Sequence, residues 1–81
     1  MIKLLQDCNI GKNIQRLRVA HHMTQADLTA AMDEYGRDMS INTLSLIENG
    51  KRNIFVSDLV RLKQIFDISF DEFFKEIPTS R

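Results

Sequence analysis

The side chains best suited to catalysis or metal binding do not come together in this sequence in a pattern that supports either. His21 and His22 are neighbours and could end a helix. Because successive helical residues point about 100° apart and no acid or cysteine is nearby in the sequence, the end of a helix is favoured over a metal site. The carboxylate pairs Asp33–Glu34 and Asp71–Glu72 are better explained as part of a turn and as the start of a helix, where acids are favoured. Because a glycine-rich phosphate loop is also missing, the sequence predicts a protein that is not an enzyme and has no metal site and no cofactor.

The totals describe one small domain. The chain has 81 residues, 43% of them hydrophobic, which is enough for a single modest core. Its one cysteine, Cys8, cannot form an internal disulfide, and this indicates a reducing cytoplasm. No apolar run approaches the roughly 18 residues that a membrane span requires, so we expect a cytoplasmic protein that makes no contact with membranes.

The charges balance overall but are unevenly distributed. The formal net charge is zero, whereas a domain that binds nucleic acid usually carries a basic surface. Cations predominate in residues 9–26 and 49–66, and acids gather in residues 33–38 and 67–76. This segregation fits a basic surface for phosphates, and it equally fits the solvated faces of a small helical protein.

Residues 40–50, S-I-N-T-L-S-L-I-E-N-G, predict a short helix that the rest of the chain presents to a partner. Ser40 is a good N-cap and Asn49–Gly50 a typical stop. Leu44 and Ile47 form a narrow buried seam. The opposite flank carries side chains that are mostly small or uncharged: Ile41, Asn42, Ser45 and Leu46. A helix this short with so thin a seam is stable only where neighbouring elements hold it.

Apolar residues recur with the helical period in four other segments: residues 10–21, 24–35, 55–67 and 69–77. Thr24 and Asp27 are predicted to form a capping box at the start of one of these helices, and Ser69 and Glu72 at the start of another. The five phenylalanines are expected to fill the core rather than to line an aromatic site. No segment alternates with period two, so no strand is predicted, and the expected fold class is all-α with five helices.

Four pieces of the chain, taken in order, resemble the lambda-repressor/Cro-like helix-turn-helix family, often called XRE-type. They are I-G-K-N-I-Q-R-L-R (residues 10–18), M-T-Q-A-D-L (23–28), S-I-N-T-L-S-L-I-E-N-G-K-R-N (40–53) and I-S-F-D-E-F-F (68–74). The resemblance implies a five-helix fold in which residues 9–77 form a helix-turn-helix DNA-binding domain, after an N-terminal arm at residues 1–8 and before a tail at residues 78–81. It also implies that the partner is double-stranded DNA.

The resemblance further implies roles for individual side chains. The helix at residues 40–49 matches the recognition helix, which lies in the major groove. Its base-reading positions hold Ile41, Asn42 and Leu46. Asn42 suits specific reading because an amide can pair bidentately with adenine, whereas the two apolar side chains offer only contacts such as that with a thymine methyl. The positions expected to bind phosphates or to set the register hold Gln25, Ser40, Thr43, Ser45, Asn49, Lys51, Arg52 and Asn53. Arg18 and Glu48 match a buried structural ion pair between the first helix and the end of the third.

The sequence departs from the family at two places. Where the family has a tight turn around one glycine, Asp33–Asp38 lengthen the connection between the second and third helices and bring acids near the duplex. Where the family often has Pro-Ser, this chain has Ile54–Phe55, and an exposed Phe55 would suit a dimer contact. Either place could bind a protein partner, and for Lys51 and Arg52 an ordinary solvated loop is the alternative to phosphate binding.

Two functions of different classes are consistent with these patterns. The first is a sequence-specific DNA-binding transcriptional regulator, a repressor of bacterial or phage type, which would act as a homodimer on a two-fold DNA site. The second is a helix-turn-helix fold that serves as a protein-interaction module, such as an antirepressor or an antitoxin-like subunit. Zero net charge, the acidic connection and the apolar residues on the presented helix favour the second. Weak, salt-sensitive binding to random duplex DNA would distinguish the two.

Overall fold

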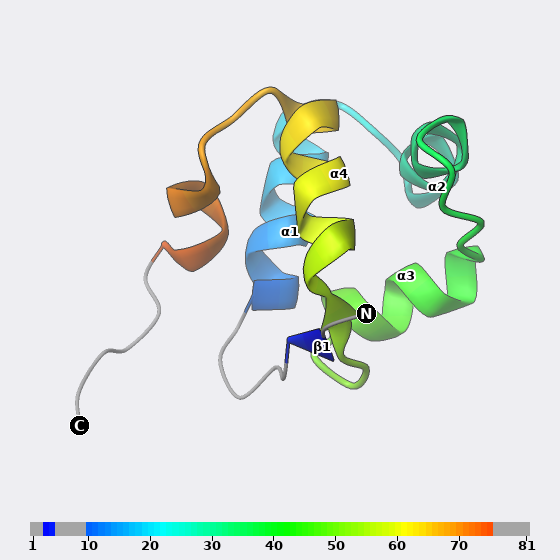
Figure 1. Cartoon of the computed structure of the whole chain (residues 1–81), viewed down its shortest axis with the longest axis horizontal. Coiled ribbons are helices and arrows are strands. Elements are labelled where there is room, and N and C mark those ends of the chain that lie inside the picture. The colour runs from blue at the N-terminus through cyan, green and yellow to red at the C-terminus, as the bar shows by residue number, and fades with distance from the viewer. Residues whose placement is uncertain (1–2, 5–9, 76–81) are drawn as a thin grey trace.

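Four α-helices and a short 3-10 helix dominate the part of the chain that the structure, a computed structural model, describes: residues 3–4 and 10–75 (Figure 1). The helices are α1 (Ile10–Ala20), α2 (Gln25–Glu34), α3 (Ile41–Glu48), α4 (Val56–Phe66) and the 3-10 helix η1 (Phe70–Phe74). Each α-helix lies where the apolar period predicts one, and the all-α class is confirmed. None of these described helices is both long enough and apolar enough to cross a membrane.

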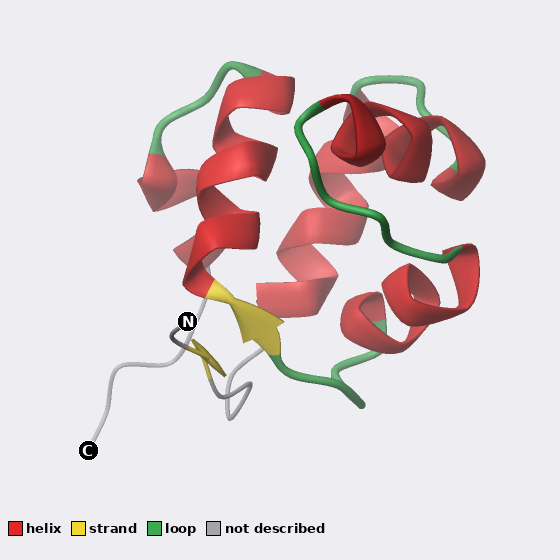
Figure 2. Ribbon diagram, turned by 45° about the vertical axis from the view of Figure 1, so that its right-hand side comes forward, coloured by secondary structure: helices red, strands yellow, loops and turns green. Residues whose placement is uncertain are grey.

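Two strands of two residues each pair at one end of the molecule (Figure 2). β1 (Lys3–Leu4) and β2 (Ile54–Phe55) are antiparallel, with Lys3 opposite Phe55 and Leu4 opposite Ile54. The prediction that no strand forms is wrong, because two residues are too few to show an alternation of period two. Apart from β1, the predicted N-terminal arm at residues 1–8 lies outside the described residues, and so does the predicted tail at residues 78–81.

The predicted fifth α-helix at residues 69–77 is wrong, and α-helices number four in the described chain. Phe70–Phe74 forms the 3-10 helix η1 instead. The predicted capping box of Ser69 and Glu72 is wrong as well, because the Ser69 side chain makes no capping hydrogen bond.

Side chains of α1 bond to the backbone of η1 and of the residue after it. Asn13 Nδ2 donates to Phe73 O at 2.8 Å and to Lys75 O at 2.9 Å. Arg16 Nη2 donates to Glu72 O at 3.0 Å. These bonds fix the carbonyls of the segment against α1, where residues 70–74 form a 3-10 helix in place of the predicted α-helix.

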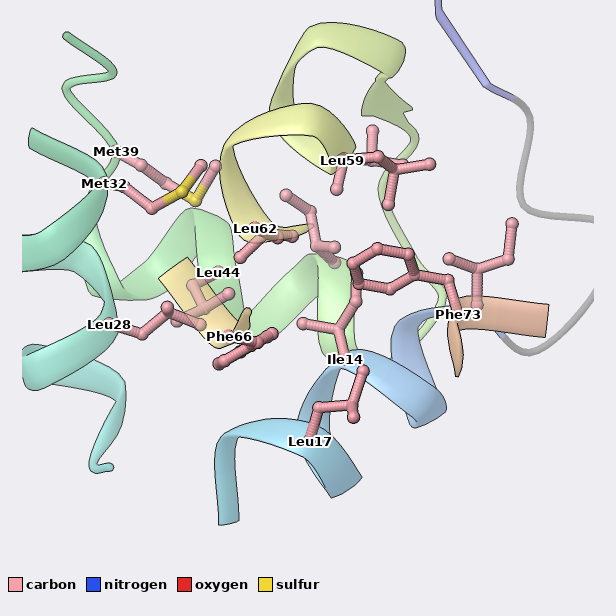
Figure 3. Close-up of a cluster of buried hydrophobic side chains, with 13 residues drawn as sticks. Ile14, Leu17, Leu28, Met32, Met39, Leu44, Leu59, Leu62, Phe66 and Phe73 are labelled. Atoms are coloured by element: carbon pink, nitrogen blue, oxygen red, sulfur yellow. The ribbon is translucent and has the colours of Figure 1, made fainter. Parts of the chain in front are cut away.

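The core draws side chains from every helix. Its buried members include Ile14, Leu17, Leu28, Met32, Met39, Leu44, Leu59, Leu62, Phe66 and Phe73 (Figure 3). The prediction that the phenylalanines fill the core holds fully only for Phe66 and Phe73. Phe70 and Phe74 are 41% and 46% exposed, and Phe55 is half-buried. Because α4 and η1 each bury one face, aromatic rings that lie off that face remain in solvent.

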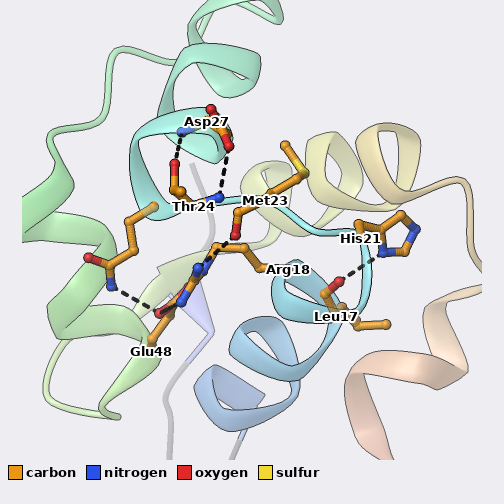
Figure 4. A network of polar contacts seen from close by, with 8 residues as sticks. Leu17, Arg18, His21, Met23, Thr24, Asp27 and Glu48 are labelled. Atoms are coloured by element: carbon orange, nitrogen blue, oxygen red, sulfur yellow. Dashed lines mark hydrogen bonds and ion pairs between the residues drawn. The ribbon is translucent and has the colours of Figure 1, made fainter.

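The predicted capping box of Thr24 and Asp27 begins α2. Thr24 Oγ1 accepts from the Asp27 N–H at 3.0 Å, and the Thr24 N–H donates to Asp27 Oδ2 at 2.9 Å (Figure 4). The hydrogen bond from the Thr24 backbone, and after it the contact with the Thr24 side chain, hold the pKa of Asp27 below its ordinary value. The helix ends at Glu34, one residue before the predicted end at Tyr35, which is its C-cap.

The connection between α2 and α3, residues 35–40, folds back onto the core (Figure 2). Gly36 has φ of +86°, a left-handed conformation that favours glycine. The Arg37 N–H donates to Met32 O at 2.9 Å, which closes the end of α2. Met39 is buried at 6% exposure. The lengthened connection is therefore anchored to the core by Met39 and leads directly into α3.

Candidate nucleic-acid interface

α3 has the boundaries that its sequence predicts. Ser40 Oγ accepts a backbone N–H of the first turn at 3.0 Å. Gly50 takes a left-handed φ of +74° beyond the last turn, where a glycine commonly ends a helix. Leu44 and Ile47 are each 2% exposed and form the predicted seam against the core. The orientation of α3 about its own axis is thereby fixed.

The outer face of α3 carries the three side chains expected to read bases. Ile41 is 48% exposed and Asn42 is exposed, whereas Leu46 is half-buried. Asn42 and Leu46 are four residues apart and so share one face, while Leu44 lies two residues from each and points to the opposite side. The outer face thus presents one amide and two aliphatic side chains, and the one carboxylate of α3 belongs to the buried Glu48.

Polar side chains expected to bind phosphates border this face. Those that are exposed are Ser40, Asn49, Lys51, Arg52 and Asn53. Thr43 and Ser45 are half-buried, and Thr43 Oγ1 accepts from the Ser40 hydroxyl at 3.0 Å. Gln25 is half-buried at the start of α2, where its Nε2 donates to Glu48 Oε1 at 3.1 Å. Its side-chain amide is therefore already bonded within the protein.

A buried ion pair joins α1 to the last residue of α3. Arg18 Nε donates to Glu48 Oε2 at 2.7 Å, and Arg18 Nη2 donates to Glu48 Oε1 at 3.2 Å (Figure 4). Arg18 Nη1 also donates to Met23 O at 2.8 Å, in the turn before α2. One guanidinium therefore ties α1, the entry to α2 and the end of α3 together in a bidentate, charge-assisted arrangement.

Ion pairs take up several of the cations that the sequence places in basic segments. Arg16 lies 3.6 Å from a Glu72 carboxylate oxygen, and Arg61 lies 2.9 Å from one of Asp58. With Arg18 also paired, most of the positive charge in residues 9–26 is structural. Lys51 and Arg52, in the loop that follows α3, are also exposed.

A second buried carboxylate, Asp58, was not singled out by the sequence patterns. It is 1% exposed and accepts from Arg37 Nε, at 3.1 Å to Oδ1 and 3.3 Å to Oδ2, and from Arg61 Nη1 at 2.9 Å. Arg61 Nε also donates to Tyr35 O at 3.2 Å. Asp58 and Arg61 are three residues apart in α4, and this spacing could have predicted the ion pair between them. The third residue of this cluster, Arg37, belongs to the lengthened connection and had no signal in the sequence.

The two places where the sequence departs from the family, Asp33–Asp38 and Ile54–Phe55, differ in how exposed their side chains are. Asp33, Glu34 and Asp38 are exposed on α2 and the connection. The expectation that Phe55 is exposed is wrong, because its ring is half-buried and the Arg37 guanidinium lies over it, 5.9 Å from the ring centroid. The connection therefore covers Phe55 as well as bonding to Asp58.

A sequence model described as helix-turn-helix matches residues 14–73, a stretch that includes α2, the connection, α3 and α4 in full. Comparisons with curated proteins and with solved structures give no match. The matching family consists of DNA-binding regulators and is not a family of enzymes. Since the match covers well over half of the chain, this protein belongs to the lambda-repressor-like, XRE-type helix-turn-helix family.

Proposed function

We propose that this chain is a sequence-specific DNA-binding transcriptional regulator, a repressor of bacterial or phage type, that inserts α3 into the major groove. The observation that carries this proposal is the uncharged outer face of α3, on a helix whose inner face is fixed by the core and by Glu48. Such a face can approach base edges without bringing a carboxylate against the duplex. In this proposal Asn42 reads adenine, and Ile41 and Leu46 make apolar contacts.

Phosphate contacts then set the position of the helix in the groove. The residues proposed for this task are Gln25, Ser40, Thr43, Ser45, Asn49, Lys51, Arg52 and Asn53. Lys51 and Arg52 supply most of the attraction, since they are exposed cations at the end of α3. Gln25 contributes through the backbone at the start of α2, because its side-chain amide is bonded to Glu48.

We also propose that the chain acts as a homodimer on a two-fold DNA site. Dimers of this class contact half-sites about 34 Å apart, one helical turn of the duplex. The exposed rings of Phe70 and Phe74 offer an apolar surface on η1 for the contact between the two copies.

A salt titration of binding to random-sequence duplex DNA tests the proposal, with fluorescence anisotropy as the readout. We expect weak binding at low salt that falls steeply toward physiological salt, because each phosphate contact releases a counterion. Lys51→Ala should lower the slope of log affinity against log salt by about one unit. Lys63→Ala removes the same charge from α4 and serves as the matched control, with no expected change in slope. Absence of binding at low salt would refute the proposal.

One observation favours the alternative, a protein-interaction module. Asp33, Glu34 and Asp38 are exposed, and Tyr35 beside them is 45% exposed, so the surface combines acidic groups with an aromatic ring. Such a surface suits a basic protein partner better than DNA. If random duplex DNA does not bind at low salt, this surface becomes the site to test with protein partners.

A further inference from the structure

A surface cleft of about 430 Å³ lies between the lengthened connection and the loop that follows α3. We name it the connection cleft, and its lining residues are Arg37, Ile47, Gly50, Lys51, Arg52, Asn53 and Phe55. We propose that the connection cleft binds a phosphate group and that Arg37 is its central contact. The favoured source is a backbone phosphate of the duplex beside α3, so this inference rests on the proposed function and adds a contact from the part of the chain that departs from the family.

The lining of the cleft has the charge that an anion requires. Three of its seven residues are cations, Arg37, Lys51 and Arg52, and none is acidic. Asn53 adds an amide, a further group able to donate hydrogen bonds. A concave site lined by one sign of charge concentrates counter-ions of the other sign.

The guanidinium of Arg37 is held in place before any ligand arrives. Its Nε donates to both carboxylate oxygens of Asp58, and its Nη1 donates to Asp38 O at 3.1 Å. Its Cζ also lies over the ring of Phe55, 5.9 Å from the centroid, within the range of a cation–π contact. An arginine carries five N–H donors, and the bonds within the described residues use those on Nε and one on Nη1. The donors that remain can bind a phosphate with little loss of side-chain entropy.

The charge of Arg37 is only partly neutralised by its carboxylate partner. Asp58 provides one negative charge and accepts from two guanidinium groups, those of Arg37 and Arg61. The cluster therefore keeps a net positive charge, which is not the case for a one-to-one pair such as Arg18 with Glu48. Asp58 is also buried beneath the surface, so its charge does not face the cleft directly.

The position of the cleft favours a duplex phosphate over a free one. Ile47 of α3 and the loop at Lys51 and Arg52 form part of its wall. A phosphate in the cleft would therefore lie beside the helix proposed to enter the major groove, where the backbone of one strand must pass. A free phosphate or a phosphate ester of a small molecule shares the same chemistry and is the other source to test.

Arg37→Gln and Arg61→Gln form a matched pair for the first experiment. Each removes one positive charge and one partner of Asp58, but only Arg37 lines the cleft. We expect Arg37→Gln to lower the salt slope for random duplex DNA by about one unit and Arg61→Gln to leave it unchanged. Thermal unfolding of both variants checks that each is folded at the temperature of the binding assay.

Inorganic phosphate and the unsubstituted protein provide the second experiment, which does not depend on a variant that folds. Titration followed by 15N NMR should shift the Arg37 side-chain Nε–H and the backbone amides of residues 50–53 in a saturable way if a free phosphate enters the cleft. Saturation without an Arg37-specific effect on DNA binding would identify the free anion as the ligand.

The outcomes separate this inference from the proposed function. If duplex DNA binds with equal slopes for both variants and inorganic phosphate gives no saturable shift, the inference is overturned while the proposed function stands. If duplex DNA does not bind at all, the proposed function fails, and the phosphate titration alone decides whether the cleft is an anion site.

Discussion

Two buried carboxylates anchor α3 from opposite ends, and they are paired differently. Glu48, the last residue of α3, is bonded by one arginine, Arg18, and by the amide of Gln25. Asp58, in the first turn of α4, is bonded by two arginines, one of which lies in the connection that leads into α3. The first arrangement is balanced in charge, and the second keeps an excess positive charge.

The difference shows how a longer connection can be accommodated. Each added residue that becomes ordered loses about 1–2 kcal/mol of backbone entropy, so a connection without contacts would loosen the start of α3. Here the connection brings its own anchors, the side chains of Arg37 and Met39. The same interaction, an arginine paired with a buried carboxylate, therefore occurs in both parts of the molecule. Arg18 with Glu48 lies in the part that matches the family, and Arg37 with Asp58 involves the part that departs from it.

Glu48→Ala is expected to have the largest effect on stability. It leaves the Arg18 guanidinium, 11% exposed, without its carboxylate, and removing one partner of a buried ion pair costs roughly 3–5 kcal/mol. Chemical denaturation at pH 7 measures the change in the free energy of unfolding. Glu34→Ala, at an exposed carboxylate of α2, is the control and should change stability by less than about 0.5 kcal/mol. A loss for Glu48→Ala as small as that of the control would show that the pair does not hold the junction.

Asp58→Ala should cost less than Glu48→Ala although Asp58 is the more deeply buried carboxylate. The side chains of Arg37 and Arg61 are 27% and 24% exposed, so both guanidinium groups can turn toward water once the carboxylate is gone. We expect a loss of about 2–4 kcal/mol, between the values for buried and exposed pairs. The same denaturation series measures it. A loss larger than that of Glu48→Ala would break the comparison, because it would make the connection the stronger anchor.

Asn42→Ala tests whether the two anchors serve a surface that reads DNA. The substitution lies on the exposed face of α3, so the free energy of unfolding should change little. On a selected DNA site we expect a loss of roughly 1–3 kcal/mol in binding and a relaxed preference at one base pair. Binding to the selected site and to single-base variants of it provides the measurement. An equal loss on all DNA sequences would exclude Asn42 as the reader.

The sequence predicts the elements of this fold better than it predicts their connections. The helical period located α1 to α4, and the capping box of Thr24 was recognised, because both signals are local. The prediction of an α-helix at residues 69–77 is wrong because this segment depends on long-range contacts. Its carbonyls accept hydrogen bonds from Asn13 and Arg16, which lie more than fifty residues earlier in the chain. Contacts across such separations leave no periodic trace in the sequence.

The candidate site divides in the same way. Ile41 and Asn42 are exposed where the helical geometry of a short capped segment with a buried seam places them. The bonds from Arg37 to Asp58 depend on how the connection folds back toward α4. An arginine and an aspartate 21 residues apart in the sequence do not by themselves predict such an ion pair. For the same reason Phe55 was expected to be exposed, because the residue that covers it comes from another part of the chain.

Asp27→Asn should have the smallest effect, and it contrasts an exposed carboxylate with the two buried ones. Because the Thr24 hydrogen bonds lower the pKa of Asp27 in the folded protein, its contribution to stability is fully present above the ordinary carboxyl pKa of about 4 and is lost as the pH falls through the lower, folded value. The stability difference between the unsubstituted protein and Asp27→Asn should therefore be constant near neutral pH and shrink in acid. Denaturation between pH 7 and pH 2 measures it. A stability difference that grows as the pH falls would mean that the Asp27 carboxylate does not act through the capping box. The start of α2 would then be held by the bond from Arg18 to Met23 O rather than by its cap.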